Sequence, residues 1–82
     1  MKEIIAKKLT DEFQPDYLEV IDESHKHAGH LAGGAINTHF LVKIKAKLLE
    51  DKTLLATHKM IFSCLKEEMR NKIHALSIKI QK

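Results

Sequence analysis

The sequence is poor in the residue types that cross-link, stiffen or kink a small domain. Its 82 residues include one cysteine, Cys64, one proline, Pro15, and no tryptophan. A single cysteine excludes an internal disulfide and is consistent with a reducing compartment, so we expect a cytoplasmic protein. Apolar runs are too short to span a membrane, and the charged first segment lacks the apolar stretch of a secretory signal. The length suits one domain, over residues 1–82.

Positive charge is concentrated in the second half of the chain. Residues 1–42 carry four lysines against seven acids, whereas residues 43–82 carry nine lysines and Arg70 against four acids. Such a basic half favours an anionic partner. Because it contains no run of consecutive basic residues, a solvated lysine-rich surface is the simpler interpretation.

The first half of the chain predicts a helix followed by two strands. Ile5, Leu9 and Phe13 are four residues apart, which places them on one face of a helix over residues 2–13. Pro15 ends that helix because proline cannot continue the hydrogen-bond ladder. Residues 17–23 and 38–46 alternate apolar and polar side chains, and we expect these strands to pair antiparallel. Between them, residues 24–37 hold all three glycines and predict a long loop.

The second half predicts a long helix and a third strand. Thr53 is the expected N-cap of a helix that reaches about Asn71. Its apolar stripe consists of Leu54, Leu55, Ile61, Phe62, Leu65 and Met69. Residues 73–80 alternate again, and the strand–helix–strand crossover makes this strand parallel to the strand at 38–46. The predicted fold class is α/β in the broad sense (α+β). It is one α-β-β-α-β domain, a three-stranded mixed sheet with helices on one face.

Six histidines are the most frequent candidates for metal ligands. Three lie in the predicted loop, and the others open the second strand, lie in the long helix and open the last strand: His25, His27, His30, His39, His58 and His74. Imidazole binds iron, zinc and copper well, but loops also gather polar residues without any metal. From spacing alone a solvated loop is the simpler interpretation. We expect His39 to be exposed, and His58 and His74 to be partly buried structural residues.

No motif of a common enzyme class is present. No serine stands in a nucleophile elbow, and Gly33-Gly34 lacks the spacing and the lysine of a phosphate-binding loop. Cys64 lies between Phe62 and Leu65 in the predicted helix, so we expect a small buried hydrophobe rather than a reactive thiol. A domain of this size also has little room for a deep substrate pocket. The sequence therefore favours a binding module over an enzyme.

Four separate stretches of the chain resemble the BolA family. They are DESHKH at 22–27, THF at 38–40, HKMIFSCLKEEM at 58–69 and IHALSIKI at 73–80. Their order and spacing match over nearly the whole chain. The most specific stretch is IHALSI directly after the long helix.

The resemblance implies a fold similar to class II KH domains and a non-enzymatic role in iron–sulfur trafficking or in iron and redox regulation. Many members bind a monothiol glutaredoxin and share a two-iron two-sulfur cluster with it, while the glutaredoxin and glutathione supply two thiol ligands. The family's histidine ligand before the last strand matches His74, and its loop ligand matches His27, with His25 and His30 as alternatives. No cluster is expected in the isolated chain, which we expect to be a monomer or a weak homodimer.

The resemblance also implies an alternative function, because some members are described as DNA-binding transcriptional regulators of stress response and cell morphology. This sequence has no GXXG loop, with which nucleic-acid-binding KH domains clamp the backbone. Residues 57–59 are Thr-His-Lys where the family has Arg-His-Arg, and residues 49–51 are Leu-Glu-Asp where it has Phe-x-Gly. Both departures weaken phosphate binding. The remaining candidates for a basic face are Lys59, Lys66, Arg70, Lys72 and Lys79.

Overall fold

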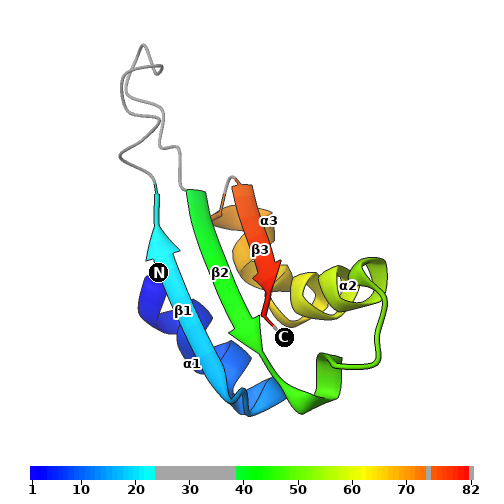
Figure 1. Cartoon of the computed structure of the whole chain (residues 1–82). Coiled ribbons are helices and arrows are strands. Elements are labelled where there is room, and N and C mark those ends of the chain that lie inside the picture. Colours follow the sequence, from blue (N-terminus) through cyan, green and yellow to red (C-terminus); the bar gives the residue numbers. More distant parts are fainter. Residues whose placement is uncertain (24–38, 74, 82) are drawn as a thin grey trace, which may run out of the picture.

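A computed structural model of the chain describes residues 1–23, 39–73 and 75–81. In chain order the elements are α1 (Lys2–Phe13), β1 (Tyr17–Asp22), β2 (His39–Lys45), the 3-10 helix η3 (Lys47–Leu49), α2 (Leu54–Cys64), α3 (Lys66–Asn71) and β3 (Ala75–Ile80) (Figure 1). This order confirms the predicted α+β class. The loop predicted at residues 24–37 lies outside the described residues. Within the described ranges, no helix has the length and apolar character needed to cross a membrane.

The sheet has three strands with β2 in the centre. β1 pairs antiparallel with β2, and β3 pairs parallel with β2, as the alternation and the crossover predicted. In this register Val20 lies opposite Val42, and Val42 lies beside Ile78. These three residues therefore form one apolar row that crosses all three strands on the same face.

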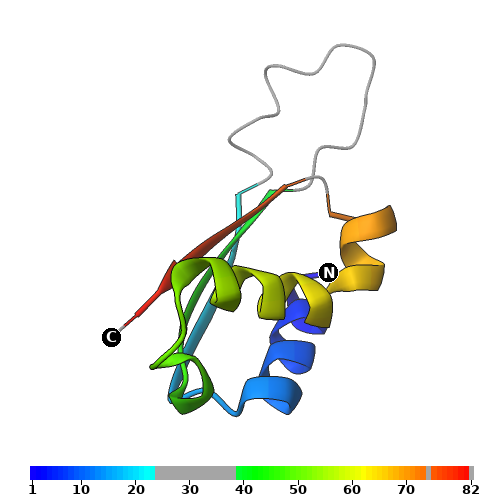
Figure 2. The ribbon, with the colours of Figure 1, turned by 90° about the vertical axis from the view of Figure 1, so that its right-hand side faces the viewer.

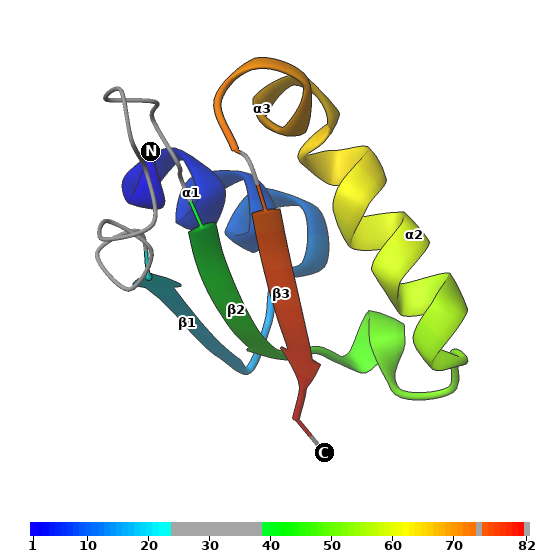
Figure 3. The same ribbon diagram turned by 90° about the horizontal axis from the view of Figure 1, so that it is seen from above.

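Among the described residues, the helices cover one face of the sheet and leave the other bare. α1 and α2 lie side by side on the same side of the strands, which the edge-on view and the view from above both show (Figures 2 and 3). Phe40, Val42 and Ile44 alternate along β2 and are buried beneath them. The buried apolar core is Ile5, Leu9, Phe13, Val20, Phe40, Val42, Ile44, Ala46, Leu49, Ile61, Leu65 and Ile73.

α1 begins and ends as the sequence predicted. Ile5, Leu9 and Phe13 are its buried residues. The helix stops at Gln14, whose φ of 45° is left-handed and whose N–H bonds to the carbonyl of Thr10 at 2.9 Å. Pro15 follows directly, so the chain leaves the helix and enters β1.

The prediction of a single long helix to Asn71 is wrong. The helical conformation is interrupted at Leu65, which has φ −103° and ψ 20° and separates α2 from α3. Leu65 itself is fully buried, and its carbonyl still accepts a bond from the N–H of Met69 at 2.9 Å. The apolar spacing of Ile61, Leu65 and Met69 continues through the interruption, so periodicity alone gave no sign of the bend.

The predicted apolar stripe of this helix is also wrong at its start. Leu54 and Leu55 are 66% and 65% exposed, although Ile61 and Leu65 on the same stripe are buried. The reason is position, because α2 begins beyond the edge of the sheet, where no strand lies beneath it (Figure 1). Thr57 is instead the first buried residue of α2, and its hydroxyl donates to the carbonyl of Leu54 at 2.8 Å.

An ion pair holds α3 against α1. Lys8 Nζ lies 2.6 Å from Glu68 Oε2, and the Glu68 side chain is only 10% exposed. The hydrogen bond from Lys8 lowers the pKa of the Glu68 carboxyl below its ordinary value of 4.5, against the opposing effect of burial. The second carboxylate oxygen, Oε1, is buried without a hydrogen-bond partner among the described residues. The buried carboxylate of Glu68 therefore depends on one strong bond to the partly exposed Lys8.

Loss of the cap at Thr53 should destabilise the domain. The Thr53 side chain accepts a hydrogen bond from the N–H of Ala56 at 3.1 Å, which confirms the predicted N-cap. We expect Thr53→Ala to lower the free energy of unfolding by about 1 kcal/mol in urea titrations. Thr53→Asn, which keeps a side-chain acceptor, should retain most of that stability. Thr10→Ala on the exposed side of α1 is the control, and an equal loss there would contradict the capping role.

The Lys8–Glu68 pair should contribute to stability only while Glu68 is ionised. Because the folded-state pKa of Glu68 is lowered, its contribution is complete above the unfolded value near 4.5 and is lost as the pH falls through the folded value. We expect Glu68→Gln to lower the urea midpoint near neutral pH, and the difference from wild type to shrink below pH 4.5. Glu67→Gln, at an exposed neighbouring position, should leave the urea midpoint unchanged both near neutral pH and at low pH. A difference independent of pH would exclude this ionic contribution.

Candidate functional site

The predicted cluster ligands lie outside the described residues. These are His27 and His74, together with the loop alternatives His25 and His30. Their ligation stays a prediction. The structure does describe the residues to which these segments are joined, namely Glu23, His39, Ile73 and Ala75.

These four joining residues are arranged at one end of the sheet. The N–H of Glu23 bonds to the carbonyl of His39 at 2.7 Å, which brings together the two ends of the segment 24–38. His39 is also the register partner of Ala75, the first residue of β3. The residues on either side of the segment with three histidines and the residue after His74 therefore lie at the same end of the sheet.

The backbone before His74 is firmly anchored. Ile73 is buried, and its N–H bonds to the carbonyl of Glu68 at 2.8 Å. The N–H of Lys72 bonds to the same carbonyl at 2.8 Å. Because the side chain of Glu68 is in turn paired with Lys8, the end of α3 is tied to both the core and α1.

His39 is half-buried, so the prediction that it is exposed is wrong. Its ring lies on the bare face of the sheet, as its place opposite Phe40 in the alternation requires. Nε2 is 3.1 Å from Ser77 Oγ and 3.9 Å from Glu23 Oε1. One side chain of β2 thus contacts side chains from the segments on either side of it. Alternation predicts the face on which His39 lies, but it does not predict the neighbours that cover the ring.

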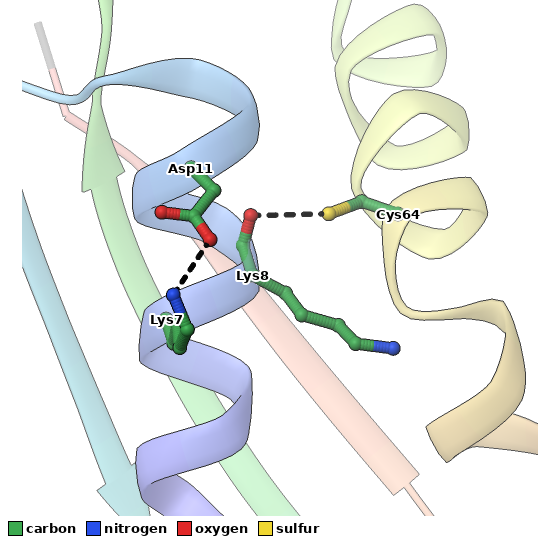
Figure 4. Close-up of polar contacts among 4 residues, drawn as sticks. All are labelled: Lys7, Lys8, Asp11 and Cys64. Atoms are coloured by element: carbon green, nitrogen blue, oxygen red, sulfur yellow. Dashed lines mark hydrogen bonds and ion pairs between the residues drawn. The ribbon is translucent and has the colours of Figure 1, made fainter.

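Cys64 is half-buried in the groove between α1 and α2 rather than fully buried. Its thiol donates to the carbonyl of Lys8 at 3.5 Å, close to the Lys7–Asp11 ion pair on the outer side of α1 (Figure 4). Burial, with a smaller effect of the Glu12 carboxylate, raises the pKa of the thiol. A protonated thiol is a poor nucleophile and a poor metal ligand, so this environment agrees with the expected inert cysteine.

The cations predicted to form one basic face are divided between two sides of the molecule. Lys59, Lys66, Arg70 and Lys72 are exposed on or directly after the helices α2 and α3. Lys79 belongs to β3 and is the register partner of Lys43, whose neighbours Val42 and Ile44 are buried on the helix side. Lys79 therefore lies on the bare face of the sheet, away from the other four.

The described residues offer no catalytic cluster. Among them, no three His, Cys, Asp or Glu side chains are grouped so as to hold a metal ion. His58 is half-buried in α2, as expected. A shallow hollow of about 570 Å³ lies at the opposite end of β2 from His39, with Lys45, Leu54, Thr57 and Ile80 in its lining. Its lining also includes the charged side chains of Glu50 and Lys52.

Comparison with known proteins agrees with this arrangement. The family model described as "BolA-like protein" matches residues 9–82. The chain is 37% identical over 78 residues to the Escherichia coli protein named DNA-binding transcriptional regulator BolA, covering 95% of this chain and 71% of that protein. It is 39% identical over 79 residues to SufE-like protein 1, chloroplastic/mitochondrial, of Arabidopsis thaliana. That match covers 90% of this chain but only 21% of the longer plant protein.

Solved structures show the same likeness. The BolA domain of SufE1 from Arabidopsis thaliana superimposes with a TM-score of 0.86 at 36% identity, over 98% of this chain and 88% of that one. BolA1 from the same plant gives a TM-score of 0.84 at 34% identity, over 99% and 89% of the two chains. The relatives from Vibrio cholerae and Escherichia coli are both named as transcriptional regulators, and the matching family model is described as a BolA-like protein. The matched family model, the relatives and the shared fold establish that the chain belongs to the BolA-like protein family.

Proposed function

We propose that this chain is a non-enzymatic module that binds a monothiol glutaredoxin and shares a two-iron two-sulfur cluster with it. In this proposal His27 and His74 are the ligands from this chain, and His25 and His30 are the alternatives in the same segment. The observation that supports it is the convergence of Glu23, His39 and Ala75 at one end of the sheet. Two segments that are distant in sequence, each with a candidate imidazole, begin from neighbouring positions there.

The donor set explains why a partner is needed. Iron–sulfur clusters are usually held by four thiolates, and two imidazoles can replace the thiolates on one iron, as in Rieske centres. Burial raises the pKa of Cys64, the only cysteine, and its thiol donates to the carbonyl of Lys8 between α1 and α2. The two remaining ligands must therefore come from outside the chain, and a glutaredoxin with glutathione supplies two thiolates. Imidazole ligands raise the reduction potential of such a cluster, and they bind only when they are deprotonated.

The anchored backbone before His74 suits a ligand position. A ligand is effective when the element that carries it is held rigidly by the surrounding structure. Here Ile73 is in the core, and both it and Lys72 bond to the carbonyl of Glu68. In this proposal His74 is the ligand that directly follows this anchored backbone.

A second candidate function is nucleic-acid binding by a transcriptional regulator. It is supported by the name of the relatives from Escherichia coli and Vibrio cholerae, DNA-binding transcriptional regulator BolA, and by the exposed cations on α2 and α3. The missing GXXG loop and the altered residues at 49–51 and 57–59 weaken this candidate for the helix side of the molecule. We therefore rank it below the cluster-binding function.

Loss of either proposed ligand should abolish the shared cluster. The protein is mixed with a monothiol glutaredoxin, glutathione, iron and sulfide, and visible absorbance and circular dichroism are recorded. We expect a spectrum that differs from that of the glutaredoxin homodimer and that reverts to it in His74→Ala and in His27→Ala. His58→Gln, in α2, is the matched control and should leave the spectrum unchanged.

The far-ultraviolet spectrum separates loss of ligation from loss of fold. Each histidine variant should keep the wild-type far-ultraviolet circular dichroism. If His25→Ala or His30→Ala removes the mixed spectrum while His27→Ala does not, the loop ligand is that residue instead. A mixed spectrum that survives in His74→Ala would exclude the proposed ligation.

A further inference from the structure

The bare face of the sheet carries three lysines that lie close together. Lys43 and Lys45 are two residues apart on β2 and therefore point to the same side. Lys79 on β3 is the register partner of Lys43, so it is their neighbour across the strands. None of the described helices covers this side of the sheet (Figure 2). The three ammonium groups thus belong to a single flat surface.

None of these lysines is neutralised within the described parts of the chain. The ion pairs found there join other residues, and no carboxylate lies within 4.0 Å of Lys43, Lys45 or Lys79. Glu19 is the register partner of Lys43, yet its Oε1 accepts a hydrogen bond of 2.7 Å from the hydroxyl of Tyr17 on its own strand. Glu19 lies opposite Lys43, but its carboxylate is directed along β1 toward Tyr17 and does not neutralise the lysines.

This arrangement costs stability in the free protein. Like charges on directly paired strand positions repel each other, and the spacing between neighbouring strands is only about 4.8 Å. Lys43 and Lys79 occupy such a pair. A bound anion between them would remove the repulsion, so the group is better suited to a complex than to the isolated domain.

An exposed aromatic ring borders the lysines. Tyr17 is 45% exposed and is the register partner of Lys45, on the same face. Its hydroxyl is fixed by Glu19, which holds the side chain in one orientation. Ile21 and Leu41 form the next apolar row toward His39 and are half-buried. The face therefore combines an aromatic ring and unpaired cations on a rigid sheet.

We propose that this surface, defined as the sheet platform of Tyr17, Lys43, Lys45 and Lys79, binds single-stranded nucleic acid. Repeated phosphates are contacted mainly by lysine and arginine, while lysine is depleted in protein–protein interfaces. Unstacked bases pack on exposed aromatic rings, and flat sheets with such rings are a known platform for single strands. A duplex is read by a helix or ribbon that enters a groove, and the platform has no such projection. This inference rests on the second candidate function, but it assigns a surface opposite the helix cations.

The salt dependence of binding tests the charge contribution. A fluorescein-labelled pyrimidine 12-mer is titrated with the whole chain at several KCl concentrations, and fluorescence anisotropy gives the affinity. Three phosphate contacts predict a slope of log K against log salt of about −2 for a single strand, and each lysine lost should reduce it by about 0.7. We expect this reduction in Lys43→Gln, Lys45→Gln and Lys79→Gln, because glutamine keeps the aliphatic stem but not the charge.

Helix-side variants provide the matched control. Lys59→Gln, Lys66→Gln and Arg70→Gln remove equal charge from the opposite side and should leave the slope unchanged. If the slope of log K against log salt falls in these variants and not in the platform variants, the assignment to the sheet platform is wrong, although nucleic-acid binding itself stands. No binding by the wild-type chain at low salt would overturn both the platform and the second candidate function, and would leave the cluster proposal untouched.

Two variants of β1 test the roles of the ring and of the acid separately. Glu19→Gln removes the acidic side chain that is the register partner of Lys43 and should tighten binding. In that background, Tyr17→Leu should weaken binding about tenfold without changing the salt slope, because stacking carries no charge. Equal affinity for the duplex form, or equal displacement by poly-L-glutamate of matched charge, would overturn the assignment to single strands. The second result would instead indicate an acidic protein as the partner.

Thermal melting shows whether the platform variants remain folded. Because the lysines repel one another, Lys79→Gln should melt at the wild-type temperature or above it. If the triple variant fails to fold, the single variants still give the change in slope. A lower melting temperature in all three single variants would contradict the argument that the lysines are unpaired.

Discussion

Burial of every second side chain of β2 is the interaction on which the other elements depend. Phe40, Val42 and Ile44 lie beneath α1 and α2, and each such side chain contributes roughly 1.5–3 kcal/mol when it leaves water. Of the three described strands, β2 alone has hydrogen-bonded neighbours on both sides. A shift of its register by one residue would expose this whole row and bury Lys43 and Lys45. The central strand therefore fixes both the register of the sheet and the side on which the helices pack.

This one-sided core separates the two proposed binding surfaces of the domain. Side chains on the helix side pack in the core, so the surfaces accessible to a partner are the bare face and the ends of the strands. The end at Glu23, His39 and Ala75 leads to the histidines proposed as cluster ligands. The bare face carries the lysines near the other end of β2. A small domain can thus present an imidazole site and a cationic surface without placing either in its core.

The sequence predicted the elements well where periodicity reflects packing. The four-residue spacing in α1, the alternation in β2 and the Thr53 cap all reappear in the structure. Prediction from the sequence failed where the apolar spacing continues although the packing or the helical backbone that it implies does not. Leu65 keeps the helical spacing although its backbone leaves the helix, and Leu54 keeps it although no strand lies beneath. A pattern records which side chains are apolar, but not how far the opposing surface extends.

The sequence by itself determined the family, the order of the elements and the face on which each strand residue lies, because these follow from local periodicity and from motifs read in order. Tertiary structure alone decided which residues are neighbours across strands. The pairing of Lys43 with Lys79, the contact of His39 with Ser77 and the separation of Lys79 from the helix cations all depend on register. Register is set by the packing of the whole core, and no single segment of the chain encodes it.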